Sequence, residues 1–272
     1  MGLKLKPVLE SESSGAAKAA VTVVLLGLSL LLTACITTST EVFESSPEDA
    51  LEARVQLARS YIGEQNWEYA KRNLKLAQDI DPNSPDVYEA FALVYQSTGE
   101  YELAEESFKR AISLRKPFSR ARNNYAAFLY SQDRLEEAEE QLEVVVQDTL
   151  YEGRPRAFIN LGLCQRRLGK NDKARVAFTR ALAMNRSNTL AMLELAHIEF
   201  DAGNWRESEG YMEMYKRFAR RQSPRALWLG IRLSRQLEDP DAEASYALAL
   251  RNLFPDSPEF QAYQLAVQNG EL

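Results

Sequence analysis

The strongest constraint on the fold is an arrangement of small and large side chains that recurs six times along the chain. Successive copies are 34, 34, 36, 34 and 34 residues apart, counted between the small residues Ala70, Ala104, Ala138, Ala174, Ser208 and Ala242. A large residue follows each of them by four positions, which places both on one face of a helix. Because a small side chain lets two helices cross closely, each copy predicts one helical pair within residues 48–256.

The first helix of each predicted pair carries its own signal, in which a large residue precedes a small one. These pairs are Leu57-Ala58, Phe91-Ala92, Tyr125-Ala126, Leu161-Gly162, Leu195-Ala196 and Leu229-Gly230. We expect each pair to face the second helix of its own unit. The two extra residues of the 36-residue interval fall in a predicted turn over residues 151–155. A last helix over residues 257–272, with Phe260, Tyr263 and Val267 on one side, is expected to cap the exposed apolar end.

This spacing resembles the tetratricopeptide repeat, although the tryptophan that the family carries in its first helix is absent. Its place holds Arg54, Tyr88, Arg122, Phe158, Met192 and Ala226. The resemblance implies an all-α fold, a right-handed superhelical solenoid of six repeats plus a C-terminal capping helix, in which the first helices line a concave surface.

The amino terminus has the pattern of an export signal. Residues 19–32 contain no charge, and Lys4, Lys6 and Lys18 precede them. Fourteen residues extend about 21 Å as a helix, too short for a hydrocarbon core of about 30 Å. A basic flank followed by a short apolar stretch predicts a signal peptide over residues 1–34.

The end of this signal, Leu32-Thr33-Ala34-Cys35, resembles the bacterial lipobox. The resemblance implies a diacylglyceryl thioether on Cys35, cleavage before it, and acylation of the new amino terminus. Residues 35–47 then form a polar tether. Ile36 stands where an aspartate commonly signals retention in the inner membrane, so the chain is expected on the periplasmic side of the outer membrane, held by several acyl chains.

The groove predicted by the repeat geometry is a mixture of apolar and polar positions, which suits an extended or helical peptide. Four residues of the first three units are the candidates for contact with a partner: Arg59, Leu93, Asn123 and Tyr130. Because neither Arg59 nor Leu93 faces the second helix of its unit, we expect that both can be changed without unfolding the solenoid.

Chemistry-bearing residues are too few for catalysis. His197 is the only histidine, which excludes zinc sites with two histidines, and glycines form no phosphate-binding cluster. Cys164 is interpreted as a packing residue, and no catalytic residue, metal site or cofactor is predicted. The net charge of −6 opposes nonspecific binding to nucleic acid. The sequence therefore predicts a protein-binding module that is not an enzyme.

Two segments narrow the family. Residues 122–129 (RNNYAAFL) and 151–164 (YEGRPRAFINLGLC) resemble the PilF/PilW family of type IV pilus biogenesis lipoproteins. The resemblance implies a pilotin: a lipoprotein that binds subunits of the secretin, the outer-membrane ring of the pilus machinery, and promotes their localisation and multimer assembly. Its acyl chains would be carried by the lipoprotein sorting machinery. The alternative is a lipoprotein adaptor for cell-wall enzymes or for β-barrel assembly.

Overall fold

The computed structural model describes residues 46–270. The predicted signal peptide, Cys35 and nearly all of the tether therefore lie outside the described residues. The helices, in chain order, are α2 (Pro47–Gly63), α3 (Trp67–Ile80), α4 (Pro85–Thr98), α5 (Tyr101–Leu114), α6 (Ser119–Ser131), α7 (Leu135–Val145), α8 (Arg154–Arg167), α9 (Asn171–Met184), α10 (Thr189–Asp201), α11 (Trp205–Phe218), α12 (Pro224–Gln236), α13 (Pro240–Leu253) and α14 (Pro258–Gln268). No strand occurs within residues 46–270.

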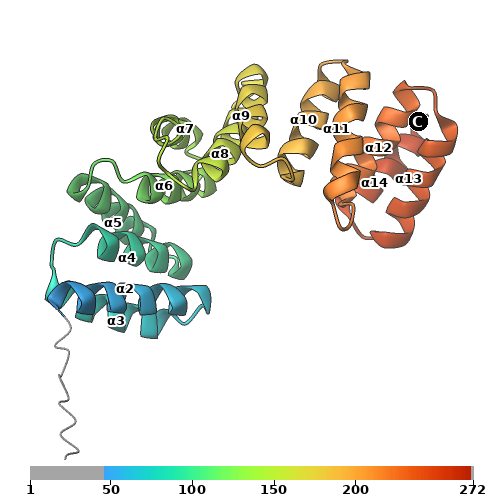
Figure 1. The fold of residues 1–272 in the computed structure, drawn as a ribbon. Coiled ribbons are helices and arrows are strands. Elements are labelled where there is room, and N and C mark those ends of the chain that lie inside the picture. Colours follow the sequence, from blue (N-terminus) through green and yellow to red (C-terminus); the bar gives the residue numbers. More distant parts are fainter. Residues whose placement is uncertain (1–45, 271–272) are drawn as a thin grey trace, which may run out of the picture. The chain divides into compact units, whose positions relative to one another are not determined.

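The helices form six antiparallel pairs, from α2 with α3 to α12 with α13, and α14 packs behind the last pair (Figure 1). First helices of successive pairs pack together at α2 with α4, α4 with α6, α6 with α8 and α10 with α12, and the pairs stack into a superhelix. The predicted fold class, an all-α tetratricopeptide solenoid, is confirmed.

The turn inside each pair contains one residue with a left-handed backbone. Glycine takes this conformation at Gly99, Gly169 and Gly203, as its lack of a Cβ atom permits. The other three turns use Gln65, Asp133 and Glu238. In the first turn the sequence contains Gly63, but this glycine ends α2 and Gln65 adopts the positive φ of 59°.

The repeated small residues are the contact points inside the pairs. The first five, from Ala70 to Ser208, are fully buried, and only Ala242 of the last pair is partly exposed. Close approach is evident at Gly162, where an added Cβ atom would lie 2.7 Å from the ring of Phe178. The Ser208 hydroxyl donates a hydrogen bond to the Ala196 carbonyl oxygen at 2.8 Å, so this polar residue fits the same buried position.

The two ends of the solenoid depart from the repeat pattern. Leu57 was expected to face α3, but 41% of its surface is exposed. At the other end Phe260 and Tyr263 of α14 pack with Trp228 of α12, as expected of a cap. Val267 was expected on the same side and is instead 48% exposed, while its neighbour Ala266 is buried.

Candidate protein-binding groove

The groove surface comes from the first helices of the six pairs, but only some of its positions reach solvent. One row of side chains lies three residues before the small residue of each first helix: Val55, Glu89, Asn123, Ile159, Leu193 and Leu227. All six are buried, with at most 6% of their surface exposed, because adjacent first helices close over them. The rows one and four residues after the small position contribute the partly exposed side chains of Arg59, Leu93 and Tyr130.

Asn123 was expected to be available to a partner, and the structure corrects this expectation. Only 3% of its surface is exposed. Its side-chain oxygen accepts a hydrogen bond at 3.1 Å from the Asn160 amide of α8. Asn123 therefore joins the first helices of the third and fourth repeats and does not offer its side chain to the groove.

Arg59 was expected to be replaceable without harm to the fold because it does not face its own second helix, but this expectation did not consider its contacts with the next repeat. Its guanidinium lies 2.6 Å from Glu89, a carboxylate with no solvent exposure, and 3.4 Å from Asp86. Leu93 is also partly buried and packs against the central hydrophobic core. Arg59 connects neighbouring repeats, because it contacts the next first helix even though it does not face its own second helix.

An ionic network connects the first three repeats on this side. Asp86 accepts hydrogen bonds from Arg115 and Arg120, and Glu89 accepts one from the Asn124 amide at 2.6 Å. Burial alone would raise the pKa of Asp86, but the hydrogen bond from Arg115 and the charges of both arginines hold this pKa below its usual value. Asp86 is therefore charged at neutral pH.

The four predicted residues do not form one continuous site. Arg59 borders a hollow of about 340 Å³ between the first helices of repeats one and two, together with Leu51 and Val55. Tyr130 borders a separate hollow of about 290 Å³ with Leu163 and Arg166. The Arg167 guanidinium stacks over the Tyr130 ring at 4.9 Å from its centre. Whether a partner contacts these residues stays a prediction.

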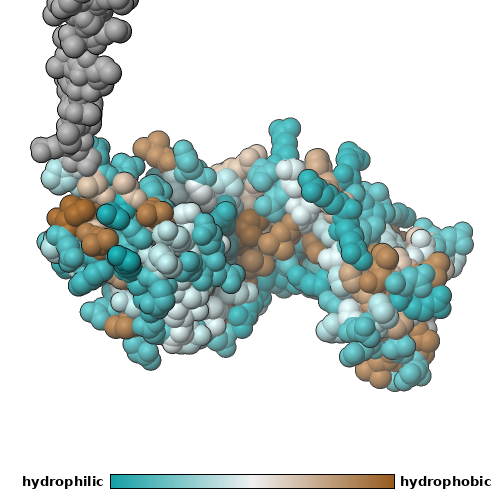
Figure 2. Space-filling model, turned by 90° about the horizontal axis from the view of Figure 1, so that it is seen from below, coloured by the Kyte–Doolittle hydropathy of each residue, from teal (hydrophilic) through white to brown (hydrophobic). Residues whose placement is uncertain are grey.

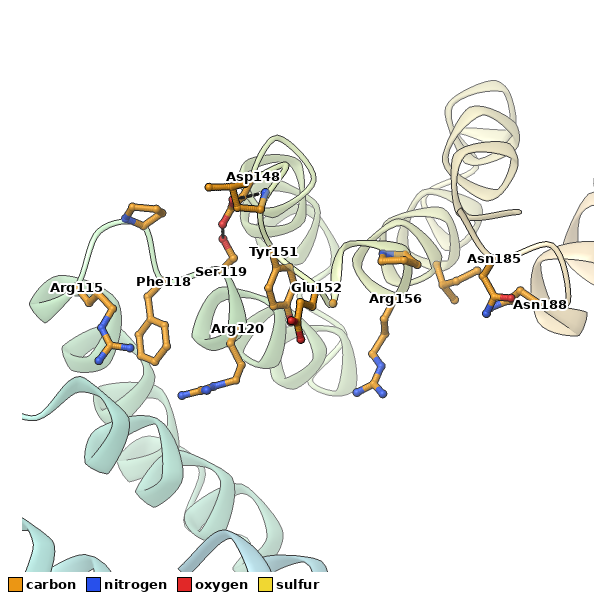
Figure 3. Close-up of a pocket in the computed structure, with 15 residues that line it drawn as sticks. Arg115, Phe118, Ser119, Arg120, Asp148, Tyr151, Glu152, Arg156, Asn185 and Asn188 are labelled. Atoms are coloured by element: carbon orange, nitrogen blue, oxygen red, sulfur yellow. Dashed lines mark hydrogen bonds between the residues drawn. The ribbon is translucent and has the colours of Figure 1, made fainter. Parts of the chain in front are cut away.

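A wider cleft, of about 950 Å³, lies where repeats three, four and five meet (Figure 3). It is lined by Arg115, Pro117, Phe118, Ser119, Arg120, Asp148, Leu150, Tyr151, Glu152, Gly153, Pro155, Arg156, Ile159, Asn185 and Asn188. None of the four predicted contact residues belongs to it. The only sequence signal for this cleft was the 36-residue interval, whose extra residues lie in its wall.

Cys164 and His197 have no reactive character in this arrangement. The Cys164 thiol is fully buried and donates a hydrogen bond to the Leu135 carbonyl oxygen at 2.9 Å, and burial raises its pKa to about 11. The interpretation of Cys164 as a packing residue is confirmed. Burial, assisted by the charges of three nearby arginines, lowers the pKa of His197 to about 3, so its ring is neutral at pH 7.

The described part of the chain holds no group of three or more His, Cys, Asp or Glu side chains arranged to bind a metal ion. Between residues 46 and 270, every helix is too short or too polar to cross a bilayer.

Comparison with known proteins agrees with this geometry. A family model for the tetratricopeptide repeat matches residues 89–155 and 159–219. The chain is 36% identical over 240 residues to the type IV pilus assembly protein PilF of Pseudomonas aeruginosa, an alignment that covers 87% of this chain and 95% of the relative.

Two solved structures share the fold over most of the described repeats. The structure of Pseudomonas aeruginosa PilF matches with a TM-score of 0.76 at 37% identity, covering 80% of this chain and 98% of that one. The structure of PilW, a widely conserved type IV pilus biogenesis factor, matches with a TM-score of 0.69 at 26% identity, covering 79% of this chain and 98% of that one.

Proposed function

Because the chain belongs to the PilF/PilW family of tetratricopeptide proteins of type IV pilus biogenesis, we propose that it is an outer-membrane pilotin lipoprotein. In this role the repeats bind secretin subunits and promote their localisation and multimer assembly in the outer membrane. The observation that carries the proposal is the 36% identity to PilF over 87% of the chain.

The lipid anchor supplies the transport step of this proposal. The lipoprotein sorting machinery recognises the acyl chains on Cys35 and transports the protein. The repeats hold the secretin subunit during this transport. Ile36 after the cysteine supports the outer membrane as the destination. Several acyl chains give stable membrane attachment, since a single chain binds only marginally.

We expect that Cys35→Ser yields a folded protein that does not become a lipoprotein. Cys35 directly follows the predicted signal peptide, and its sulfur is the proposed attachment point of the lipid. Cells fed labelled palmitate should label the wild type and not the variant. Cys164→Ser is the matched control: its thiol is buried within the repeats, so labelling should be unchanged. Equal labelling of the wild type and Cys35→Ser would remove the lipobox from the proposal.

The first repeat supports binding of a protein partner. It exposes large apolar side chains where a surface that only contacts solvent would carry polar ones. These are Leu57, Tyr69, Leu76 and Ile80, each between 39% and 52% exposed. Figure 2 shows apolar residues gathered over this end of the repeats. Apolar side chains that cluster on a surface mark interaction sites, and this repeat directly follows the tether in the sequence.

We expect cells that lack the protein to accumulate secretin monomers and to lose heat-resistant secretin multimers and twitching motility. The same loss, in weaker form, is expected for a Leu57→Glu and Leu76→Glu double variant, because charges there oppose apolar contact without removing a buried side chain. Immunoblots of unheated and heated membranes separate multimers from monomers.

The matched control is Leu248→Glu with Leu265→Glu, which changes two leucines of similar exposure at the opposite end of the repeats. This control should assemble secretin normally. If multimers form at wild-type levels in cells without the protein, the pilotin proposal fails, and the adaptor for cell-wall enzymes or β-barrel assembly replaces it.

A further inference from the structure

The turn between α7 and α8 is longer than the other turns between repeats, and it is ordered by its own hydrogen bonds. Asp148 organises it: one carboxylate oxygen accepts a hydrogen bond from the Leu150 amide at 3.1 Å, and the other accepts one from the Ser119 hydroxyl of α6. The Arg154 side chain donates to the Val146 carbonyl oxygen at 2.7 Å and ties the far end of the turn. The two added residues therefore build a fixed element of structure.

This turn presents an apolar side chain to solvent. Leu150 is 91% exposed, the largest exposure of any large hydrophobic residue in the described chain, although the backbone around it is held in place. The partly exposed Tyr151 and Pro155 extend the apolar surface into the cleft beneath it. Because the turn is already ordered, little conformational entropy is lost when Leu150 packs against a ligand.

Three polar side chains of the cleft are donors with unused capacity, namely Arg156, Asn185 and Asn188. Arg156 is exposed and makes no ion pair with any described residue. The side-chain oxygens of Asn185 and Asn188 accept hydrogen bonds from the backbone amides of Ser187 and Ala191, at 3.1 and 2.8 Å respectively. Their NH₂ groups have no acceptor within the described chain. Arg120 reaches the same side of the cleft as Arg156, and the two flank Tyr151 (Figure 3).

Acceptors are fewer in the cleft. Of its two carboxylates, Asp148 is committed to Ser119 and Leu150, which leaves Glu152 at the rim. Of the three arginines in the lining, Arg115 and Arg120 are paired with Asp86, which leaves Arg156 as the one without an ion pair in the described chain. The unpaired Arg156 guanidinium and the NH₂ groups of Asn185 and Asn188 are therefore the donors complementary to a carboxylate.

We propose that this cleft is a second binding site, distinct from the first repeat, for an extended peptide segment in which an acidic side chain adjoins an apolar one. The carboxylate accepts hydrogen bonds from Arg156 and from the amides of Asn185 or Asn188, and such charge-assisted bonds are the strong ones. The apolar side chain packs against Leu150 and Tyr151. The site requires no secretin and stands whether or not the protein is a pilotin.

The test uses the full-length chain in detergent and fluorescein-labelled nine-residue peptides of alternating glutamate and leucine. Fluorescence anisotropy should show that this peptide binds about tenfold more tightly than its glutamine–leucine counterpart and that lysine–leucine does not bind. Its affinity should fall as salt is raised, because the arginines are solvent-exposed. Arg156→Glu and Leu150→Ser should each weaken binding by about tenfold.

Matched controls are Arg180→Glu and Val176→Ser on α9, an exposed arginine without an ion pair in the described chain and an exposed apolar residue, which should leave affinity unchanged. The first-repeat double variant should also bind the peptide normally. Wild-type affinity in both cleft variants, equal binding of the glutamine peptide, or no binding of any peptide would overturn the proposal. So would binding of phosphatidylglycerol vesicles through Arg156 without binding of the peptide, which would assign the cleft to a lipid surface.

Discussion

Replacing Phe108 with alanine is expected to lower the free energy of unfolding by about 3–5 kcal/mol. Phe108 lies on α5, is completely buried, and meets two rings of α6: its centre is 5.6 Å from that of Tyr125 and 5.9 Å from that of Phe128. It therefore fills the space between the second and third repeats. Alanine would leave a cavity that neighbouring helices, fixed by their own repeats, cannot close.

Urea unfolding followed by far-ultraviolet circular dichroism measures this change. Phe108→Leu, which keeps most of the volume, should cost less, and Tyr69→Ala on the 52% exposed side chain of α3 should cost little. A loss below about 1 kcal/mol for Phe108→Ala would mean that the repeats unfold independently of this contact.

Packing inside each repeat could be predicted from the sequence, because it depends on spacing alone. The recurring small residue, the large residue four positions later and the turn between helices each follow from a fixed helical geometry. Ala104, Phe108 and Gly162 occupy the buried positions that this geometry predicts. The same reasoning failed in the first described repeat, where Leu57 has the sequence pattern of a packed residue but is 41% exposed.

Packing between repeats could not be predicted in the same way. Whether a groove residue is exposed depends on how closely successive first helices approach one another. The 34-residue period does not determine that distance. Asn123 was therefore placed at the groove surface although α8 covers it. The cleft beside Leu150 was missed for a related reason, because the sequence does not say whether an inserted turn is flexible or ordered. Here the turn is ordered by the hydrogen bonds that Asp148 accepts from Ser119 and Leu150.

Replacing Arg59 with glutamate is expected to destabilise the first two repeats by about 3 kcal/mol. Glu89 has no solvent exposure, and the Arg59 guanidinium at 2.6 Å is its nearest cation, since the Nε atom of Arg120 is 3.7 Å away. Reversal of the charge leaves Glu89 buried beside a second carboxylate, with Arg120 and the Asn124 amide as its remaining partners. A buried charge that loses its partner costs far more than an intact pair contributes.

A double variant separates this effect from loss of packing. Arg59→Met with Glu89→Leu removes both charges and keeps similar volume, and its stability should lie within about 1.5 kcal/mol of the wild type. Glu89→Leu alone leaves Arg59 beside Asp86 at 3.4 Å and should be milder than Arg59→Glu. Thermal and urea unfolding of the wild type, Arg59→Met, Glu89→Leu and the double variant closes the cycle that gives the coupling energy. If Arg59→Glu has the same free energy of unfolding as the wild type, the Arg59–Glu89 ion pair has no structural role. Arg59 would then again be a candidate for contact with a partner.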